Sequence, residues 1–349
     1  MSAAFLAPGD PRWTRALEAL PHDVYHRPEY VACLARHEGG RPAAFLAETG
    51  RATLLVPLVA REPPPELGAP SDWSDLSTPY GYGSPVVSPG ASAAAVREAL
   101  LELRRSAAAS GAVTAFLRLH PLLPFPREAL DGLGTLVRHG ATVLIDLALP
   151  AERCRAAMRS GHREEIQRLR RDGYRVAMDD WSHFGAFREL YAETMARLGA
   201  EEFYRFSDAH FVALRESLGE RLHLGSVLAP DGRVAAAALF TETDGIVQYH
   251  LSGTAEAHRR RAPTKLLLDA AAEWARDRGD RVLHLGGGVG GREDGVFAFK
   301  AGFSALRGEF HTCRMVLDAA RYEVLRRSRT RLRGLTGAAP DFFPAYRGR

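Results

Sequence analysis

Lysine is almost absent from this chain of 349 residues, because Lys265 and Lys300 are the only lysines among 46 basic residues. A coding bias toward arginine is the simplest cause of this composition. Arginine poorly replaces a compact, strongly hydrated ammonium on a flexible stem. The two remaining lysines are therefore candidates for a chemical role, although we expect Lys265, in the first turn of a helix, to lie at the surface.

Cysteine pairs and long apolar segments are also missing. The three cysteines, Cys33, Cys154 and Cys313, stand far apart without a C-x-x-C pair, which argues against a disulfide framework or a zinc site. No apolar run approaches the ~20 residues of a membrane helix. The first residues lack the positive segment and apolar stretch of a secretory signal. We expect a cytoplasmic protein with no membrane segment, no metal and no bound cofactor.

The charge is modest in total and uneven in distribution. The net charge of +4 is compatible with a polyanionic partner but does not indicate one. Arginines gather in 153–175 and in 321–349. The first group is mixed with acidic residues, so a solvated helix face explains it as well as a phosphate-binding stripe does. The second has eight arginines against Glu323 and Asp341, which favours an anionic partner such as RNA; nothing indicates DNA.

The two halves of the chain repeat one order of predicted elements: helices, antiparallel strands, a long helix, a buried strand, a short helix and a closing strand. The long helices are expected at 92–109 and 263–278, the buried strands at 113–120 and 282–285, and the closing strands at 136–147 and 305–317. This order predicts an α/β (α+β) fold of two similar domains, 1–149 and 150–320, followed by a basic C-terminal tail, 321–349.

Three further predictions concern local structure. Alternating apolar residues over 42–48 and 51–60 predict a β-hairpin. The segment that follows, as far as Gly90, is rich in Pro, Gly, Ser and Asp and is expected to be a loop. A single charged helix is predicted over 151–171.

A glycine-rich segment, Leu285–Phe303 (LGGGVGGREDGVFAFKAGF), combines a buried strand, a loop and a short helix. Such a loop lets the backbone approach a ligand closely and can bind anions through its N–H groups. It matches neither dinucleotide nor nucleoside-triphosphate fingerprints. A plain loop is the alternative, but Phe299 and the rare Lys300 directly after it favour a functional site.

This segment resembles the second-domain signature of the Fem-type aminoacyltransferases and their GNAT (acetyltransferase-fold) relatives. Further matching segments are Ser77–Gly83, Phe116–Pro121, Met158–Arg163 and Tyr249–Gly253. The resemblance implies two tandem GNAT-like domains with the acceptor in the cleft between them. It also implies transfer of an amino acid from aminoacyl-tRNA to an amine, often on a cell-wall precursor. The long coiled-coil arm of some members is absent, so a small amine-bearing metabolite or a peptide is a serious alternative to a cell-wall acceptor.

The resemblance also implies roles for individual residues. Lys300 matches the lysine near the reacting ester, Phe299 its aromatic neighbour, and Tyr249 an acceptor-site tyrosine. We expect Gly286, Gly287, Gly288 and Arg292 to bind the donor. Arg259 and Arg260 stand where coenzyme A enzymes of this fold bind pyrophosphate, but the glycines of that turn are missing. Acyl-coenzyme A or an acyl carrier protein is therefore the alternative donor.

Other candidates rest on residue type and position alone. Those for acceptor binding are Tyr204 and Arg197 near a predicted helix, Tyr80, Tyr82 and Asp75 in the long loop, and His250 on a strand. A general base for the amine is less visible, and the candidates are His250, Asp294, Glu293 and Asp75. Each has a structural alternative in core packing or surface solvation. A catalytically silent RNA- or peptide-binding module is the remaining interpretation of the chain.

Overall fold

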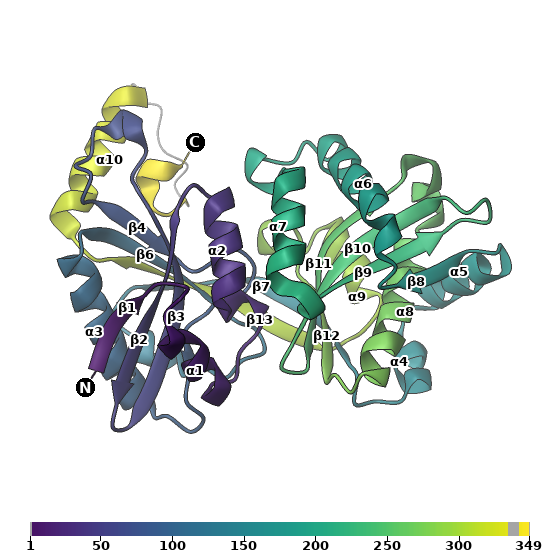
Figure 1. Ribbon diagram of the computed structural model, residues 1–349, viewed down its shortest axis with the longest axis horizontal. Coiled ribbons are helices and arrows are strands. Elements are labelled where there is room, and N and C mark those ends of the chain that lie inside the picture. Colours follow the sequence, from purple (N-terminus) through teal and green to yellow (C-terminus); the bar gives the residue numbers. More distant parts are fainter. Residues whose placement is uncertain (1, 334–341, 349) are drawn as a thin grey trace. The chain divides into compact units, whose positions relative to one another are not determined.

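The computed structural model describes residues 2–333 and 342–348, and the chain divides into two compact units. The first unit comprises Met1–His139 and Phe310–Arg349, and the second comprises Gly140–Glu309. Each unit contains a mixed sheet with helices packed against it (Figure 1). The units differ from the contiguous domains 1–149 and 150–320 and the separate tail 321–349 that the sequence suggested.

The sheet of the first unit has the strand order β1-β2-β3-β4-β6-β13. Its strands are β1 (Ser2–Leu6), β2 (Arg41–Thr49), β3 (Ala52–Arg61), β4 (Ser74–Ser77), β6 (Ala112–Leu119) and β13 (Arg307–Val316), and the short β5 (Val86–Val87) pairs with β3. Strands β4 and β6 are parallel, and the other neighbours are antiparallel. The helices of this unit are α1 (Pro11–Ala19), α2 (Pro28–His37), α3 (Ala93–Ala109) and α10 (Ala319–Arg333).

The sheet of the second unit has the order β7-β12-β11-β10-β9-β8. Its strands are β7 (Thr135–Asp146), β8 (Arg175–Met178), β9 (Leu222–Leu228), β10 (Val234–Thr243), β11 (Ile246–Thr254) and β12 (Val282–Gly286). Strands β11 and β12 are parallel, whereas the other pairs are antiparallel. The helices are α4 (Ala151–Ala157), α5 (Ser160–Arg171), α6 (Phe184–Arg197), α7 (Asp208–Leu218), α8 (Thr264–Asp277) and α9 (Gly295–Ala301).

The repeated order of elements is confirmed. Each unit runs through a strand, two helices, three antiparallel strands, a long helix, and a strand parallel to the third of those strands. The closing strands are exchanged, because β7 pairs with β12 through Val143–Asp146 and β13 pairs with β6 through His311–Val316. Contiguous boundaries do not describe these units, since the last strand of the chain completes the first sheet.

Helix α8 anchors one face of the second sheet. Its apolar side places Leu266, Leu267 and Ala271 in the core, while the buried carboxylate of Asp269 faces α4 and α5. That carboxylate accepts hydrogen bonds from Arg155 (3.0 and 3.2 Å) and from Arg170 (2.7 Å). The arginines of 153–175 thus include two that hold helices together, and a solvated face is only part of their explanation.

Lys265 does not lie at the surface, as its place in the first turn of α8 suggested. Its side chain is 13% exposed and forms an ion pair with Glu165 of α5. The pair spans two helices that pack against the same core. Lys265 therefore has a structural partner, and the second lysine of the chain, Lys300, has a different environment.

The single helix predicted over 151–171 is two helices in the structure. Helix α4 ends at Ala157, and α5 begins at Ser160 after an extended turn at Met158 and Arg159. The turn lets the N–H of Arg159 donate to the carbonyl of Gly302 at 2.8 Å. Helical periodicity could not reveal this break, because its cause is a bond to a segment about 140 residues away in sequence.

The expected basic tail begins as a helix, α10, that packs on the first unit. Leu325 of this helix is buried with Tyr346, Leu67 and Val113. Arg326 and Arg327 bind Glu323, and Arg329 binds Glu66. These arginines are less available to an anionic partner than their number in the sequence suggests; Asp341 lies outside the described residues.

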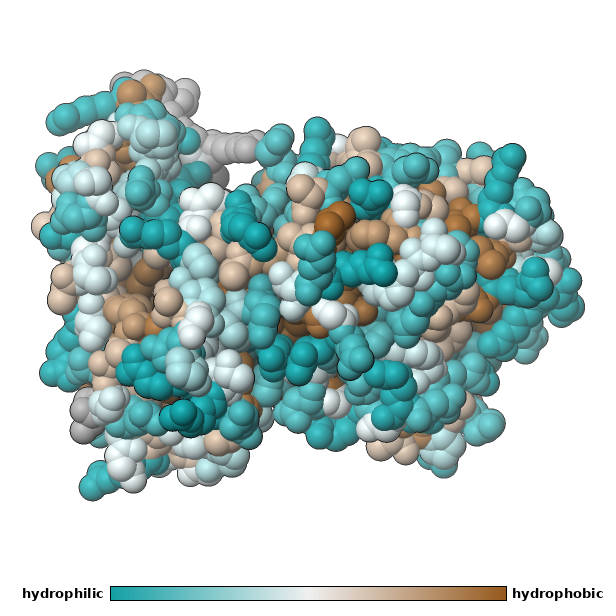
Figure 2. All heavy atoms as spheres, in the orientation of Figure 1, coloured by the Kyte–Doolittle hydropathy of each residue, from teal (hydrophilic) through white to brown (hydrophobic). Residues whose placement is uncertain are grey.

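Within the described part of the chain, no helix is long and apolar enough to cross a membrane. The exposed large hydrophobic side chains are mostly scattered through the sequence. On the face shown in Figure 2, hydrophobic residues lie in small groups among hydrophilic ones.

Asp280, in the turn between α8 and β12, makes stability depend on pH. It is 8% exposed, and its Oδ2 has no hydrogen-bond partner among the residues described. Burial, together with the charge of Glu242, raises the pKa of this carboxyl from 3.8 to about 6. The pKa is higher in the folded state than in the unfolded chain, so protonation of Asp280 favours folding. This contribution to the free energy of unfolding is complete below about pH 4 and is lost as the pH rises through 6.

Asp280→Asn should therefore raise the free energy of unfolding by about 1–3 kcal/mol at pH 8 and change it little at pH 4. Urea unfolding at the two pH values measures both effects. Asp277→Asn, an exposed position at the end of the same helix, is the control and should change neither. An equal gain from Asp280→Asn at both pH values would contradict the assignment.

Candidate active site

The parallel strands β11 and β12 pair along only part of their length. Their register runs from Ile246 opposite Val282 to Gln248 opposite His284 and then stops. A 2.7 Å hydrogen bond joins the side chains of Gln248 and His284 at the last pair. Beyond it, β11 continues beside β10, and β12 continues beside β7. The two strands thus diverge at their carboxyl ends, where ligands bind in many α/β sheets.

A β-bulge lies directly after the point of divergence. Leu239 of β10 is opposite Leu251, but the next residue, Phe240, is opposite Tyr249, so His250 is the extra residue. Bulges redirect side chains and are frequent beside active sites. Tyr249 packs on Phe240 with ring centroids 5.8 Å apart. The bulge therefore places Tyr249 and His250 at the opening between the strands.

The phenol of Tyr249 is held in its neutral form. It donates a 2.6 Å hydrogen bond to Ser252 Oγ. Burial raises the pKa of Tyr249 to about 12, and the bond to Ser252 only partly opposes this effect. At neutral pH the hydroxyl is thus a hydrogen-bond donor and not a phenolate. The sequence prediction of Tyr249 as a site residue did not include Ser252.

The glycine-rich loop after β12 folds tightly against the start of α9. Gly286 has φ +75°, and a Cβ on Gly288 would lie 2.0 Å from the carbonyl oxygen of Arg292. The carboxylate of Asp294 accepts bonds from the N–H groups of Val289 (3.0 Å) and Phe297 (2.9 Å). Asp294 is therefore the cap of α9, and this structural role opposes its candidacy as a general base.

Lys300 projects from α9 back to this loop. Its Nζ donates a 2.7 Å hydrogen bond to the carbonyl oxygen of Gly287 and lies 5.9 Å from the centroid of the Tyr249 ring. Burial lowers the pKa of Lys300 to about 8, an effect that the charge of Asp294 only partly opposes. No carboxylate in residues 2–333 or 342–348 forms an ion pair with it. The side chain is a desolvated ammonium held by a carbonyl and an aromatic face.

Phe299 belongs to the same support. His162 of α5 contacts the carbonyl oxygen of Phe299 through Nε2 at 2.9 Å, and the two rings lie 5.8 Å apart. A Cβ on Gly302 would lie 2.4 Å from His162, so only glycine lets the helices approach this closely. Phe299 thus packs on the core beneath the site, and His162, which lies in the matching segment Met158–Arg163 but had no predicted role of its own, fixes α9 against α5.

Residues 156–300 match the family model described as an acetyltransferase (GNAT) domain. This segment is a GNAT domain. It spans the diverging strands, the bulge, the glycine-rich loop and Lys300 and lies inside the second unit. The protein is accordingly an N-acyltransferase, as the resemblance implied.

Solved structures share the fold of most of the chain. FemX has a TM-score of 0.67 at 12% identity, covering 89% of this chain and 97% of FemX. L-PGS from Bacillus licheniformis has a TM-score of 0.57 at 14% identity, covering 93% and 97%. The C-terminal domain of a putative lysylphosphatidylglycerol synthetase from Agrobacterium fabrum has 0.56 at 16%, covering 86% and 89%. No curated protein sequence matches the chain.

The start of α8 in the GNAT domain holds the arginines predicted to bind the donor. Arg259 pairs with Glu256 at 3.2 Å and Arg261 with Asp172, whereas Arg260 is exposed. Pro263 occupies the N-cap position of α8. Arg292, predicted to bind the donor at the other segment, is exposed after the glycine loop. Most charge at the start of α8 is thus neutralised within the protein.

The predicted acceptor residues are divided between the two units. Arg197, at the end of α6, lies 3.2 Å from Glu256 and 3.8 Å from Glu193. Tyr204 accepts a 2.7 Å bond from the Tyr191 hydroxyl through its backbone oxygen. Both lie in the second unit, as do Tyr249 and His250. Tyr80, Tyr82 and Asp75 belong to the first unit.

Asp75 has a structural role in place of the predicted acceptor contact. Its side chain is 2% exposed and accepts hydrogen bonds from Thr114 (2.8 Å) and from the Tyr346 hydroxyl. Arg347 completes the set with Nε 2.6 Å from Oδ2. All these partners lie in the first unit. The carboxylate thus anchors the C-terminal residues, which the sequence could not show because they are about 270 positions away.

Proposed function

We propose that the protein transfers an aminoacyl group from aminoacyl-tRNA to the amine of a small metabolite, a peptide or a cell-wall precursor. The observation that carries this proposal is Lys300, a desolvated ammonium between Gly287 and Tyr249 where β11 and β12 diverge. A cation in a site of low dielectric is suited to stabilise an oxyanion. The site supports acyl transfer to an amine better than it supports binding alone.

The reaction needs few groups from the protein. The lone pair of the amine attacks the ester carbonyl carbon, and negative charge develops on the carbonyl oxygen. The C–O bond to the ribose then breaks, the ribose hydroxyl leaves with a proton, and the nitrogen loses a proton as the amide forms. Lys300 would stabilise the oxyanion, and Tyr249 would orient the reactants. An aminoacyl ester is already activated, so a strong protein base is not required.

Two observations favour aminoacyl-tRNA as the donor. The sequence resembles Fem-type enzymes, for which aminoacyl-tRNA is the usual donor. One structural neighbour is, by its title, the C-terminal domain of a putative lysylphosphatidylglycerol synthetase, a name that denotes an enzyme joining lysine to a lipid. Acyl-coenzyme A or an acyl carrier protein remains the alternative, favoured by Arg260 at the start of α8. Against it, the neighbouring Arg259 and Arg261 already have carboxylate partners. A tRNA donor places the reaction in the cytoplasm.

One experiment separates these functions. The protein is incubated with charged total tRNA, acetyl-coenzyme A and a set of amines, with and without ribonuclease. Transfer that ribonuclease abolishes supports the proposal, and release of coenzyme A supports the alternative. Absence of turnover with every donor would instead favour a catalytically silent binding module.

The pH dependence tests the charge state of Lys300. If the ammonium is the active form, the single-turnover rate should fall above about pH 8, by up to tenfold per pH unit, because that is the pKa of the buried amine. A base role would make the rate rise through the same range. The acceptor amine also titrates, so Lys300→Met is the reference, and the falling limb should be missing from its profile.

A further inference from the structure

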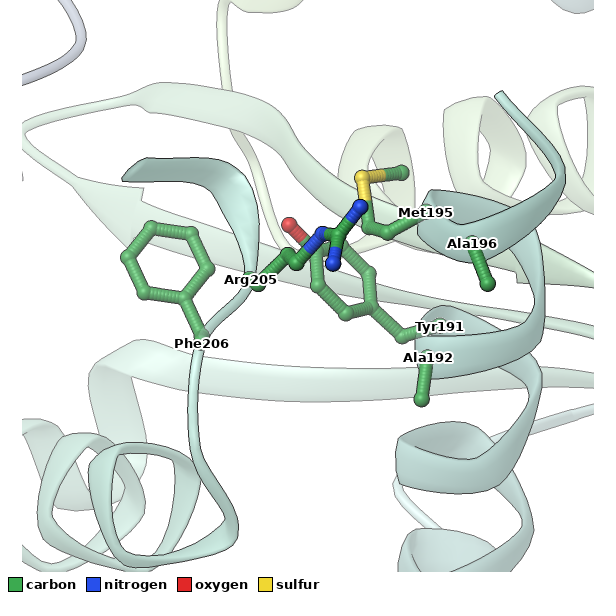
Figure 3. A pocket seen from close by; sticks show the side chains of 6 residues that line it. All are labelled: Tyr191, Ala192, Met195, Ala196, Arg205 and Phe206. Atoms are coloured by element: carbon green, nitrogen blue, oxygen red, sulfur yellow. The ribbon is translucent and has the colours of Figure 1, made fainter. Parts of the chain in front are cut away.

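A small pocket lies between α6 and the segment that follows the 3₁₀ turn Glu202–Tyr204, in the second unit (Figure 3). Its volume is about 130 Å³. The residues that line it are Tyr191, Ala192, Met195 and Ala196 from α6 and Arg205 and Phe206 from the later segment. The walls are therefore apolar except for one guanidinium and one phenol. This volume suits a single side chain, since sites for drug-sized ligands measure about 300–1,000 Å³.

The guanidinium of Arg205 is largely uncommitted. Its Nε donates to the carbonyl of Ala200 at 3.1 Å, but its two terminal nitrogens meet no acceptor among the described residues. The arginines of the neighbouring helix α6 differ, because Arg188 pairs with Asp208 at 3.2 Å and Arg197 with Glu256 at 3.2 Å. Figure 3 shows the Arg205 side chain beside Tyr191 and Met195. A planar pair of donors next to an apolar wall suits a carboxylate attached to an apolar group.

The helix that forms this pocket is fixed to the strand of the active site. The N–H of Thr254 in β11 donates to Thr194 Oγ1 of α6 at 3.1 Å. A Cβ on Gly253 would lie 2.4 Å from the carbonyl carbon of Leu190, so glycine allows α6 and β11 to touch. The same strand carries Tyr249 and His250 at the bulge. Pocket and bulge thus lie on one helix and one strand that contact each other directly.

We propose that this pocket binds the acceptor, and that the acceptor is an apolar α-amino acid or a peptide that ends in one. The apolar side chain fills the space against Met195 and Phe206, and the free carboxylate pairs with Arg205. The aminoacyl donor does not fit this position, because its carboxyl group is esterified and its α-amino group is cationic. This inference rests on the proposed function and narrows its acceptor class.

The test is direct binding without any donor. Gly-Leu, Gly-Phe and their C-terminal amides are titrated into the wild-type protein and three variants by calorimetry. In the wild type the free carboxylates should bind at least tenfold more tightly than the amides, and Arg205→Gln should bind acid and amide equally. Ala196→Trp, which fills the pocket, should weaken binding of the acids at least tenfold. Arg233→Gln, an exposed arginine elsewhere in the unit, should behave as the wild type.

Three results would overturn the inference: equal wild-type binding of acids and amides, discrimination that survives Arg205→Gln, or binding that Ala196→Trp leaves unchanged. Failure of every peptide to saturate the protein at millimolar concentration would overturn it as well. Because these titrations need no tRNA, they are independent of the proposed reaction. Peptide binding with no transfer from any donor would refute the proposed function but would still support the pocket as a peptide-binding site.

Discussion

Lys300→Ala should lower the single-turnover rate of acyl transfer by about two to three orders of magnitude, roughly 2.7–4 kcal/mol of transition-state stabilisation. The reason is the position of the ammonium, bound to Gly287 and beside Tyr249, where it meets developing negative charge with little solvent screening. Lys300→Arg should recover little of the rate, because a planar fork cannot place one compact charge at the same point.

Two controls separate catalysis from folding. Lys300→Met removes the charge, keeps an unbranched apolar stem, and should reduce the rate as alanine does while circular dichroism shows a folded protein. Lys265→Arg changes the only other lysine, keeps a cation for Glu165 and should stay within a few-fold of the wild-type rate. If Lys300→Ala costs only about 1 kcal/mol of stability and turnover stays within a few-fold, Lys300 is merely a link between α9 and its loop.

Asp75→Ala should lower the free energy of unfolding by about 3 kcal/mol, measured by urea denaturation. The substitution leaves the Tyr346 hydroxyl and the Arg347 guanidinium without their buried acceptor. We expect the lower end of the range for broken buried ion pairs, because the Arg347 side chain is 17% exposed and can turn to water. The C-terminal residues should then become sensitive to proteolysis, since their polar anchor is lost.

The same variant also distinguishes a structural role of Asp75 from an acceptor-binding role. A structural carboxylate leaves the KM for the acceptor within a few-fold of its wild-type value when rates are expressed per folded protein. Unchanged stability with a KM at least tenfold higher would restore the acceptor-binding role. Asp72→Ala, an exposed carboxylate of the same segment, should change stability by no more than about 0.5 kcal/mol.

Local patterns predicted most elements of the fold. The alternating residues of 42–60 form the hairpin of β2 and β3, and the long amphipathic segments form α3 and α8. Strands β1 and β4 were not predicted. Strand β4 has four residues inside a segment rich in Pro, Gly and Ser, and its hydrogen bonds come from β3 and β6. Short strands of this kind carry too little periodicity to be distinguished from loop.

The candidate site was predicted in part. Lys300 was found because lysine is rare in the chain, and Tyr249 was found by its resemblance to a family motif. The bulge at His250, the bond from Lys300 to Gly287 and the role of His162 depend on strand register and helix packing. A sequence lists none of these contacts. Asp294 and Asp75 were candidate bases because the sequence does not show their hydrogen-bond partners. In the structure, backbone N–H groups donate to Asp294, and C-terminal side chains donate to Asp75.

The sequence by itself determined the repeated order of elements, the glycine-rich loop and the identity of the rare ammonium at its end. These features are local, because helix and strand periodicity and backbone freedom act between near neighbours in the chain. Only the tertiary structure decided which strand closes each sheet, which carboxylates are anchors, and that burial lowers the pKa of Lys300 to about 8. The physical reason is that desolvation and strand pairing depend on residues far apart in sequence, whose proximity exists only in the folded chain.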